Sequence, residues 1–263
     1  MSSLTVPGAG IGFDLSGEDA SGPVVVQLHG LTSSRTRDRV LGLDLGREFS
    51  GRLLRYDARG HGHSTGRPVP HDYVWERLAD DLLALLDHVC PGEAVHGVGP
   101  SMGTGTLLHA AIREPGRFLG LTLVVPPTVW ESRRAQASTY ESQAALVEAH
   151  GMDALVALGQ EAASPPAAPA APPTQPDVLQ ELLPSLLRGA ALADLPTAEA
   201  VAEVLVPTHI LAWADDPTHP LSTANALHEL LSGSTLTVAS KAEEVAAWPA
   251  LLSAQVLATA GSA

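Results

Sequence analysis

The chain has 263 residues, 45% of them hydrophobic, so it carries enough apolar material for a buried core and is not an intrinsically disordered protein. Its formal net charge is −14 at pH 7, which disfavours contact with the phosphate backbone of a nucleic acid. No apolar run approaches the roughly 20 residues that a membrane-spanning helix needs.

The compartment is predicted from two further features. Residues 1–5 have neither a charged start nor an apolar stretch, so we expect no secretory signal. The single cysteine, Cys90, allows no internal disulfide. Both features predict a protein of the reducing cytoplasm, without a membrane partner.

Short apolar runs alternate with helical patterns along most of the chain. Leucines recur at three- and four-residue steps in the clearest helix, 75–88, where Asp80 and Asp81 are expected on a solvated face. Such alternation predicts βαβ units and a mainly parallel sheet of about eight strands. The expected strands are one or two antiparallel edge strands within 4–15, and runs at 24–28, 52–56, 94–98, 119–125, 208–213 and 235–239.

The strand signal disappears between residues 130 and 203, where helical stretches rich in alanine and leucine take over. Within them, residues 164–176 are rich in proline and predict an extended surface loop. We therefore expect an α/β core made of residues 1–128 and 205–263, with a helical cap at 129–204.

One motif predicts a nucleophile. Residues 99–103, Gly-Pro-Ser-Met-Gly, match the pattern G-x-S-x-G. The motif follows a predicted strand and opens a predicted helix, the setting in which a serine is held exposed on a strained turn. Ser101 is therefore the candidate nucleophile.

A second motif predicts the groups that stabilise an oxyanion. Residues 28–31, Leu-His-Gly-Leu, end the first central strand, and the glycine allows a backbone turn toward a cleft. The N–H groups of Leu31 and Met102 would then point at one place. We expect His29 to brace this loop beside the substrate rather than to transfer protons.

These two motifs, together with residues 56–64 (Tyr-Asp-Ala-Arg-Gly-His-Gly-His-Ser), resemble the α/β-hydrolase superfamily, and within it the capped lactonase and esterase branch. The resemblance implies an eight-stranded, mostly parallel sheet flanked by helices. It places the catalytic carboxylate on Asp216, with Asp215 as the less favoured candidate. It also implies that the histidines and charged residues of 56–64 form a structural turn and not a metal site. No metal or cofactor is expected.

The sequence departs from the family at the general base. The resemblance places a histidine after the last strand, but residues 240–242 are Ser-Lys-Ala. His219, three residues after Asp216, is the tentative base. His150, Lys241, a water molecule or a substrate group are alternatives, and a site without a conventional triad remains open. Without a base, Ser101 would be a weakly activated nucleophile.

Two functions therefore remain in view. The first is hydrolysis of a small ester, thioester or lactone through Ser101. The second is binding, or a cofactor-free rearrangement, by a protein that has kept the fold and lost hydrolysis. Either would act on a small molecule, in a pocket to which Trp130 and Tyr140 contribute apolar surface. Arginines gathered between Arg35 and Arg77 could face an anionic substrate or form a solvated face. The sequence leaves open whether the chain forms a homo-oligomer.

Overall fold

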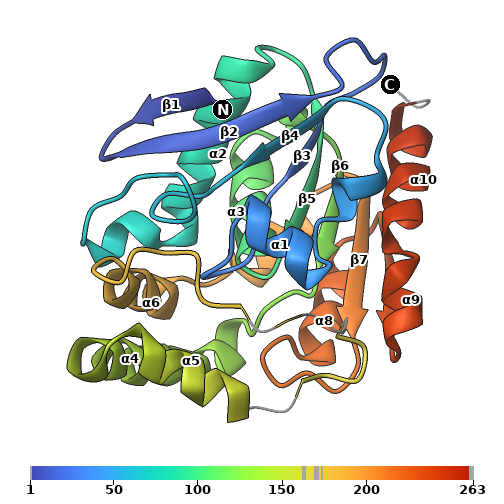
Figure 1. Ribbon diagram of the computed structural model, residues 1–263. Helices are drawn as coiled ribbons and strands as arrows, with labels where there is room; N and C mark the ends of the chain where they lie inside the picture. Colours follow the sequence, from blue (N-terminus) through green and yellow to red (C-terminus); the bar gives the residue numbers. More distant parts are fainter. Residues whose placement is uncertain (1, 162–163, 169–171, 173, 261–263) are drawn as a thin grey trace.

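The computed structural model describes residues 2–161, 164–168, 172 and 174–260. Within them, eight strands form one sheet in the order β1-β2-β4-β3-β5-β6-β7-β8. The first two pairings in this order, β1 with β2 and β2 with β4, are antiparallel, and all other pairings are parallel. Figure 1 shows this twisted sheet with helices on both faces. The predicted fold class is confirmed.

The strands are β1 (Ser2–Val6), β2 (Ala9–Ser16), β3 (Val25–Gln27), β4 (Leu53–Tyr56), β5 (Val95–Pro100), β6 (Phe118–Val124), β7 (Thr208–Trp213) and β8 (Ser234–Ala239). The α-helices are α1 (Arg35–Leu41), α2 (Trp75–Val89), α3 (Met102–Arg113), α4 (Trp130–His150), α5 (Met152–Glu161), α6 (Leu183–Leu192), α7 (Ala198–Ala202), α8 (Leu221–Leu230), α9 (Ala242–Ala246) and α10 (Trp248–Ala260). Short 3-10 helices are Leu45–Glu48, Pro70–Tyr73 and Pro115–Arg117. No helix in the described part of the chain is long and apolar enough to cross a membrane.

Alternate residues of the central strands point to opposite faces of the sheet, each of which is covered by its own apolar cluster. In β7, Ile210 joins the cluster that contains Leu82 of α2 and Leu107 of α3. Its neighbour Leu211 joins the cluster that contains Trp248 and Leu252 of α10. Burial on both faces explains why these strands appear in the sequence as unbroken apolar runs.

The helices α4 to α7 all lie in the chain between β6 and β7. Helix α4 packs against α5 and α6, and Figure 1 shows the three gathered at one end of the sheet. A separate apolar cluster joins Ala144 and Val147 of α4 to Leu183 and Leu186 of α6. This arrangement places a helical layer over the edge at which the parallel strands end.

Candidate active site

Ser101 occupies a sharp turn between β5 and α3. Its backbone angles are φ 50° and ψ −108°, a conformation that costs energy for any residue except glycine. The turn is possible because the backbones approach closely, since a Cβ atom on Gly99 would lie 2.5 Å from the carbonyl carbon of Gly103. The Ser101 N–H donates to the Val124 carbonyl of β6 at 2.9 Å, which anchors the turn to the sheet.

His219 and Asp216 meet Ser101 from the loop between β7 and α8. The His219 Nε2 atom lies 3.0 Å from Ser101 Oγ, and His219 Nδ1 lies 2.7 Å from Asp216 Oδ2. With Nδ1 protonated toward the carboxylate, Nε2 is free to accept the hydroxyl proton. The structure thus brings together the expected nucleophile, carboxylate and tentative base in one hydrogen-bonded chain.

The loop fixes both members of the His219–Asp216 pair. The other carboxylate oxygen of Asp216, Oδ1, accepts from the backbone N–H of Thr218 at 2.8 Å and of His219 at 3.3 Å. Burial alone would raise the pKa of the Asp216 carboxyl, but the His219 contact and these N–H groups outweigh it and hold that pKa below its usual range. Trp213 meets the His219 ring edge to face, with centroids 6.0 Å apart. The Asp216 carboxylate and the Trp213 ring therefore both orient the His219 imidazole.

The loop after β3 lies directly against the nucleophile. A Cβ atom on Gly30 would be 3.7 Å from the Cβ of Ser101. Within the described residues, the N–H groups of Leu31 and Met102 have no hydrogen-bond acceptor, whereas the neighbouring Ser33 N–H donates to the Gly30 carbonyl. Two N–H donors left without a partner beside a serine are available for a developing negative charge.

His29 holds this loop from behind and does not line the space in front of Ser101. It is 2% exposed, its Nε2 accepts from the Ala58 N–H at 2.9 Å, and its Nδ1 lies 2.8 Å from the Gly30 carbonyl oxygen. Burial lowers the pKa of His29, which favours the neutral ring. Both ring nitrogens are engaged by the backbone, so the structure brings His29 to the loop and not to a bound substrate.

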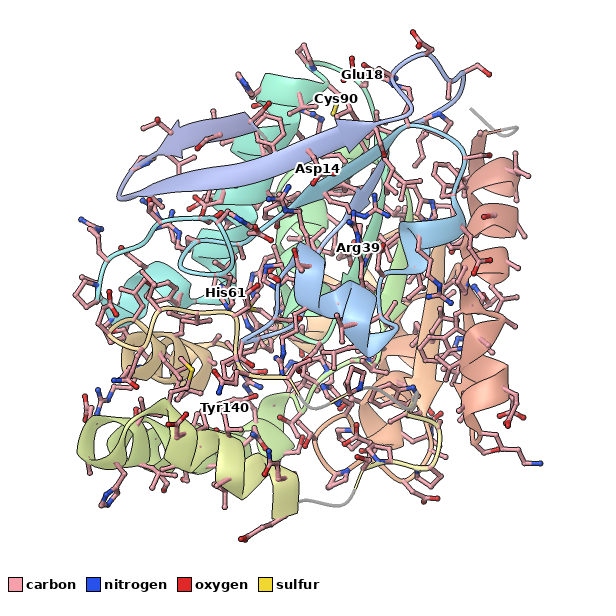
Figure 2. The ribbon with its side chains drawn as sticks, viewed as in Figure 1. Asp14, Glu18, Arg39, His61, Cys90 and Tyr140 are labelled. Carbon is pink, nitrogen blue, oxygen red and sulfur yellow. The ribbon has the colours of Figure 1, made fainter. Side chains whose placement is uncertain are left out.

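A cavity of about 1120 Å³ opens in front of Ser101. It lies between the ends of the parallel strands and the helical layer, and Tyr140 of α4, labelled in Figure 2, lies on its wall together with Leu155 of α5. Trp130 does not line it, because its indole N–H donates to the Pro196 carbonyl and its backbone N–H to Asp194. The structure thus brings Tyr140, and not Trp130, to the candidate site.

The other candidate bases lie elsewhere. Lys241 directly precedes α9 on the surface, where the Glu244 carboxylate accepts from the backbone N–H groups of Ser240 and Lys241. His150 is exposed at the end of α4. Neither lines the cavity that contains Ser101.

The 56–64 segment is a hydrogen-bonded turn. Asp57 accepts from the guanidinium of Arg35 at 3.0 Å, and Arg59 makes two 2.6 Å bonds to Asp81. Asp81 is 3% exposed, so the expectation that it lies on a solvated face is wrong; it faces inward because Arg59 is fully buried and needs a counter-ion. No group of three or more possible ligands for a metal ion is found among the described residues.

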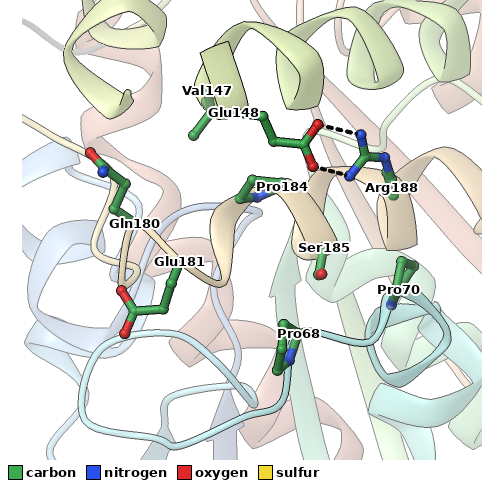
Figure 3. A pocket seen from close by; sticks show the side chains of 9 residues that line it. All are labelled: Pro68, Pro70, Val147, Glu148, Gln180, Glu181, Pro184, Ser185 and Arg188. Atoms are coloured by element: carbon green, nitrogen blue, oxygen red, sulfur yellow. Dashed lines mark hydrogen bonds and ion pairs between the residues drawn. The ribbon is translucent and has the colours of Figure 1, made fainter. Parts of the chain in front are cut away.

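A second, smaller pocket of about 580 Å³ lies away from the serine, between α4, α6 and the Pro68–Pro70 segment (Figure 3). The Glu148–Arg188 ion pair crosses one side of it, with nitrogen–oxygen distances of 2.6 and 2.8 Å. Its walls contain no nucleophile paired with a base. The candidate nucleophile, base and carboxylate are thus found at the larger cavity and not here.

Arg37 and Asp38 of α1 also line that larger cavity, and no motif in the sequence singles them out as site residues. A sequence signal for them exists: Ser34 caps the helix, and its hydroxyl accepts from the Arg37 N–H. A helix that begins five residues after Gly30, which lies against Ser101, must place its first turn near the cleft.

Comparison with known proteins identifies the fold family. A family model described as alpha/beta hydrolase fold matches residues 23–145. The 3-oxoadipate enol-lactonase 2 of Acinetobacter baylyi is 32% identical over 195 residues, which are 71% of this chain and 69% of that protein.

Solved structures resemble the whole chain. A hydrolase from Pseudomonas aeruginosa PA01 is 26% identical, with a TM-score of 0.80 over 99% of this chain and 98% of its own. The enol-lactonase from Burkholderia xenovorans LB400 is 20% identical, with a TM-score of 0.76 over 98% of this chain and 99% of its own. The chain belongs to the alpha/beta hydrolase fold family.

Proposed function

We propose that this protein hydrolyses a small ester, thioester or lactone through Ser101, with His219 as general base and Asp216 as the carboxylate that orients it. The observation that carries the proposal is the pair of distances, 3.0 Å from His219 to the Ser101 hydroxyl and 2.7 Å from His219 to Asp216. The lactonase and hydrolase relatives support the same reaction class.

The proposed reaction proceeds in two halves. Ser101 Oγ attacks the substrate carbonyl carbon while its proton passes to His219 Nε2, and the Leu31 and Met102 N–H groups bind the resulting oxyanion. The intermediate collapses, the carbonyl–oxygen or carbonyl–sulfur bond breaks, and His219 protonates the leaving group. Water then attacks the acyl-serine, His219 takes its proton, and the acid leaves as Ser101 regains its hydrogen.

The proposed triad keeps the usual chain order of this fold, Ser101, Asp216 and then His219, but its base lies at an unusual position. Its base and its carboxylate sit three residues apart on one loop, and the position after β8 where the family resemblance places a histidine holds Lys241. We propose that His219 substitutes for that histidine because β5 and β7 end at the same edge of the sheet, with only β6 between them. We further propose that the helices within 129–204 form a cap that closes the cavity over Ser101.

Steady-state hydrolysis of para-nitrophenyl butyrate tests the assignment. We expect Ser101→Ala to abolish turnover and His219→Gln to lower kcat by about 10² to 10⁴, the usual contribution of general-base catalysis. Lys241→Gln is the matched control and should retain the wild-type rate. Turnover that survives His219→Gln and disappears in Lys241→Gln would assign the base to the lysine instead. Absence of turnover in the wild-type protein on esters, thioesters and lactones alike would contradict the proposed function.

A further inference from the structure

Arg37 differs from most arginines in the described part of the chain because no carboxylate there lies within 4.0 Å of it. Ion pairs within 4.0 Å join the other arginines of the 35–77 segment to aspartate or glutamate, as in Arg39 with Asp44 and Arg52 with Glu93. In the described part of the chain, no carboxylate lies within that distance of Arg37. A half-buried guanidinium without a counter-ion is costly unless something supplies the negative charge.

The side chain is nevertheless held in place. Arg37 Nη1 donates to the Thr32 carbonyl at 3.0 Å and to the Thr32 hydroxyl at 3.3 Å, and Nε donates to Thr174 Oγ1 at 2.9 Å. Its second terminal nitrogen, Nη2, donates to no group among the described residues. The guanidinium is thus fixed on one side and retains free N–H donors on the other.

The location of Arg37 connects it to the proposed chemistry. It lines the same cavity as Ser101 and His219, and it is the one lysine or arginine among the described residues that do so. Its anchor, Thr32, immediately follows Leu31, the proposed oxyanion donor. Much of the remaining wall is apolar, with Leu41, Leu155 and Trp213 among its members. The cavity therefore pairs one fixed positive group with an apolar chamber.

Other charges face this position. Burial lowers the pKa of Arg37, and the nearby carboxylates of Asp38 and Asp177 partly oppose this shift. Asp38 is itself hydrogen-bonded to Ser33, and Asp177 accepts from Ser34 Oγ at 2.6 Å. Glu161 also lines the cavity, from the exposed end of α5. One oxygen of each aspartate is bonded to a serine, and neither carboxylate lies within 4.0 Å of the guanidinium, so Arg37 Nη2 remains for a ligand.

We infer that Arg37 determines substrate specificity by binding a carboxylate on the substrate, so that the preferred ester, thioester or lactone carries a negative charge at the end remote from the reacting carbonyl. This inference rests on the proposed hydrolytic function of the Ser101 cavity. Arginine suits the role because its planar N–H groups match the two oxygens of a carboxylate. The anion would also reach a positive group inside a molecule whose net charge of −14 otherwise repels it.

Matched substrates test the inference. The para-nitrophenyl monoester of glutarate differs from para-nitrophenyl valerate only by a carboxylate in place of a methyl group, and the adipate and hexanoate esters repeat the comparison with one more methylene. We expect the wild-type protein to favour the charged member of a pair in kcat/KM. In Arg37→Gln the ratio of charged to neutral kcat/KM should fall by about 10- to 100-fold, the range for a lost hydrogen bond to a charged group.

Two variants separate recognition from a merely structural role. Arg39→Gln is the matched control: Arg39 lies on the same helix (labelled in Figure 2), is 53% exposed and does not line the cavity, so its ratio should equal that of the wild type. Arg37→Lys should keep part of the preference, since the charge remains without the planar geometry. An equal loss on both members of each pair in Arg37→Gln, or no wild-type preference, would overturn the inference.

A binding measurement decides the matter even where no ester is hydrolysed. Calorimetric titration of Ser101→Ala with glutarate should give saturable binding that the added Arg37→Gln change weakens about tenfold and the added Arg39→Gln change leaves intact. Glutarate affinity that is undetectable, or unchanged by Arg37→Gln, would overturn the role of Arg37 without touching the role of Ser101. If the wild-type protein hydrolyses no ester but glutarate still binds in an Arg37-dependent way, only the proposed function is contradicted.

Discussion

Asp38 is a buried carboxyl group whose ionisation opposes folding. It is 2% exposed, one oxygen accepts from the Ser33 hydroxyl, and the other has no partner among the described residues. Burial raises the pKa of Asp38 to about 7, with a further upward contribution from Asp44 and an opposing one from Arg37. Asp57 also raises it slightly. The folded protein therefore binds this proton more tightly than the unfolded chain, whose aspartates titrate near about 3.9.

The sign of the resulting pH dependence is fixed by linkage. Stability associated with the protonated Asp38 is fully present below about pH 4 and is lost as pH rises toward about 7. Asp38→Asn removes the ionisation, so its free energy of unfolding relative to wild type should increase between pH 4 and pH 7. Urea unfolding at several pH values measures this, with exposed Asp19→Asn as the control. A difference that stays constant with pH would contradict the assignment.

His219 illustrates what a residue pattern can and cannot establish. The G-x-S-x-G motif, the Leu28–Leu31 loop and Asp216 are each recognisable from neighbouring residues, and the structure brings them together. A role for His219 is harder to predict from the sequence, because the family resemblance places the histidine in the loop after β8. What decides its position is the path of the 214–219 loop, in which two backbone N–H groups fold back onto Asp216 Oδ1 and carry the ring toward Ser101.

At the scale of elements, the approach of α2 and α3 depends on a missing side chain. A Cβ atom on Gly105 of α3 would lie 2.2 Å from the Trp75 ring of α2. Gly105→Ala should therefore lower the free energy of unfolding by about 1–3 kcal/mol, since a well-packed core must shift to accept the methyl group. Gly159 of α5 is the matched position, because a Cβ atom there meets nothing within 4 Å.

Chemical denaturation of the two variants provides the comparison. Gly159→Ala should raise the free energy of unfolding by about 0.5–1 kcal/mol, the helix propensity gained when alanine replaces glycine. Equal effects of the two substitutions would show that close packing of α3 against Trp75 does not limit this region.

The elements themselves are largely encoded in local patterns. The predicted strands at 208–213 and 235–239 correspond to β7 (Thr208–Trp213) and β8 (Ser234–Ala239). A strand of a covered parallel sheet has a continuous apolar sequence, which can be recognised without knowing the neighbouring strands. Inside 129–204 the sequence predicts helices, but it does not predict which face of each helix points toward the cavity. Tyr140 reaches the cavity and Trp130 does not, because Asp194 and Pro196 engage the backbone and indole of Trp130. Part of the predicted loop at 164–176 lies outside the described residues.

At the scale of the whole molecule, the candidate site is assembled from distant segments. Ser101 follows β5, His219 follows β7, Arg37 belongs to α1, and Tyr140 comes from α4. Ser101 and His219 lie close together because parallel strands place their carboxyl ends at the same edge of the sheet, and the helices lie next to that edge. A linear pattern can nominate the strand ends. It does not show which side chains of the helices point into the cavity, so Tyr140 could be told from Trp130, and Arg37 singled out, only in the structure.

The central claim is that His219 activates Ser101. The most direct measurement is the rate at which a fluorophosphonate labels Ser101 at neutral pH, with the modified residue located by mass spectrometry. We predict rapid, stoichiometric labelling of Ser101 in the wild-type protein and in Lys241→Gln, and labelling slower by about 10² to 10⁴ in His219→Gln. Labelling of Ser101 at the same rate with and without His219 would contradict the account.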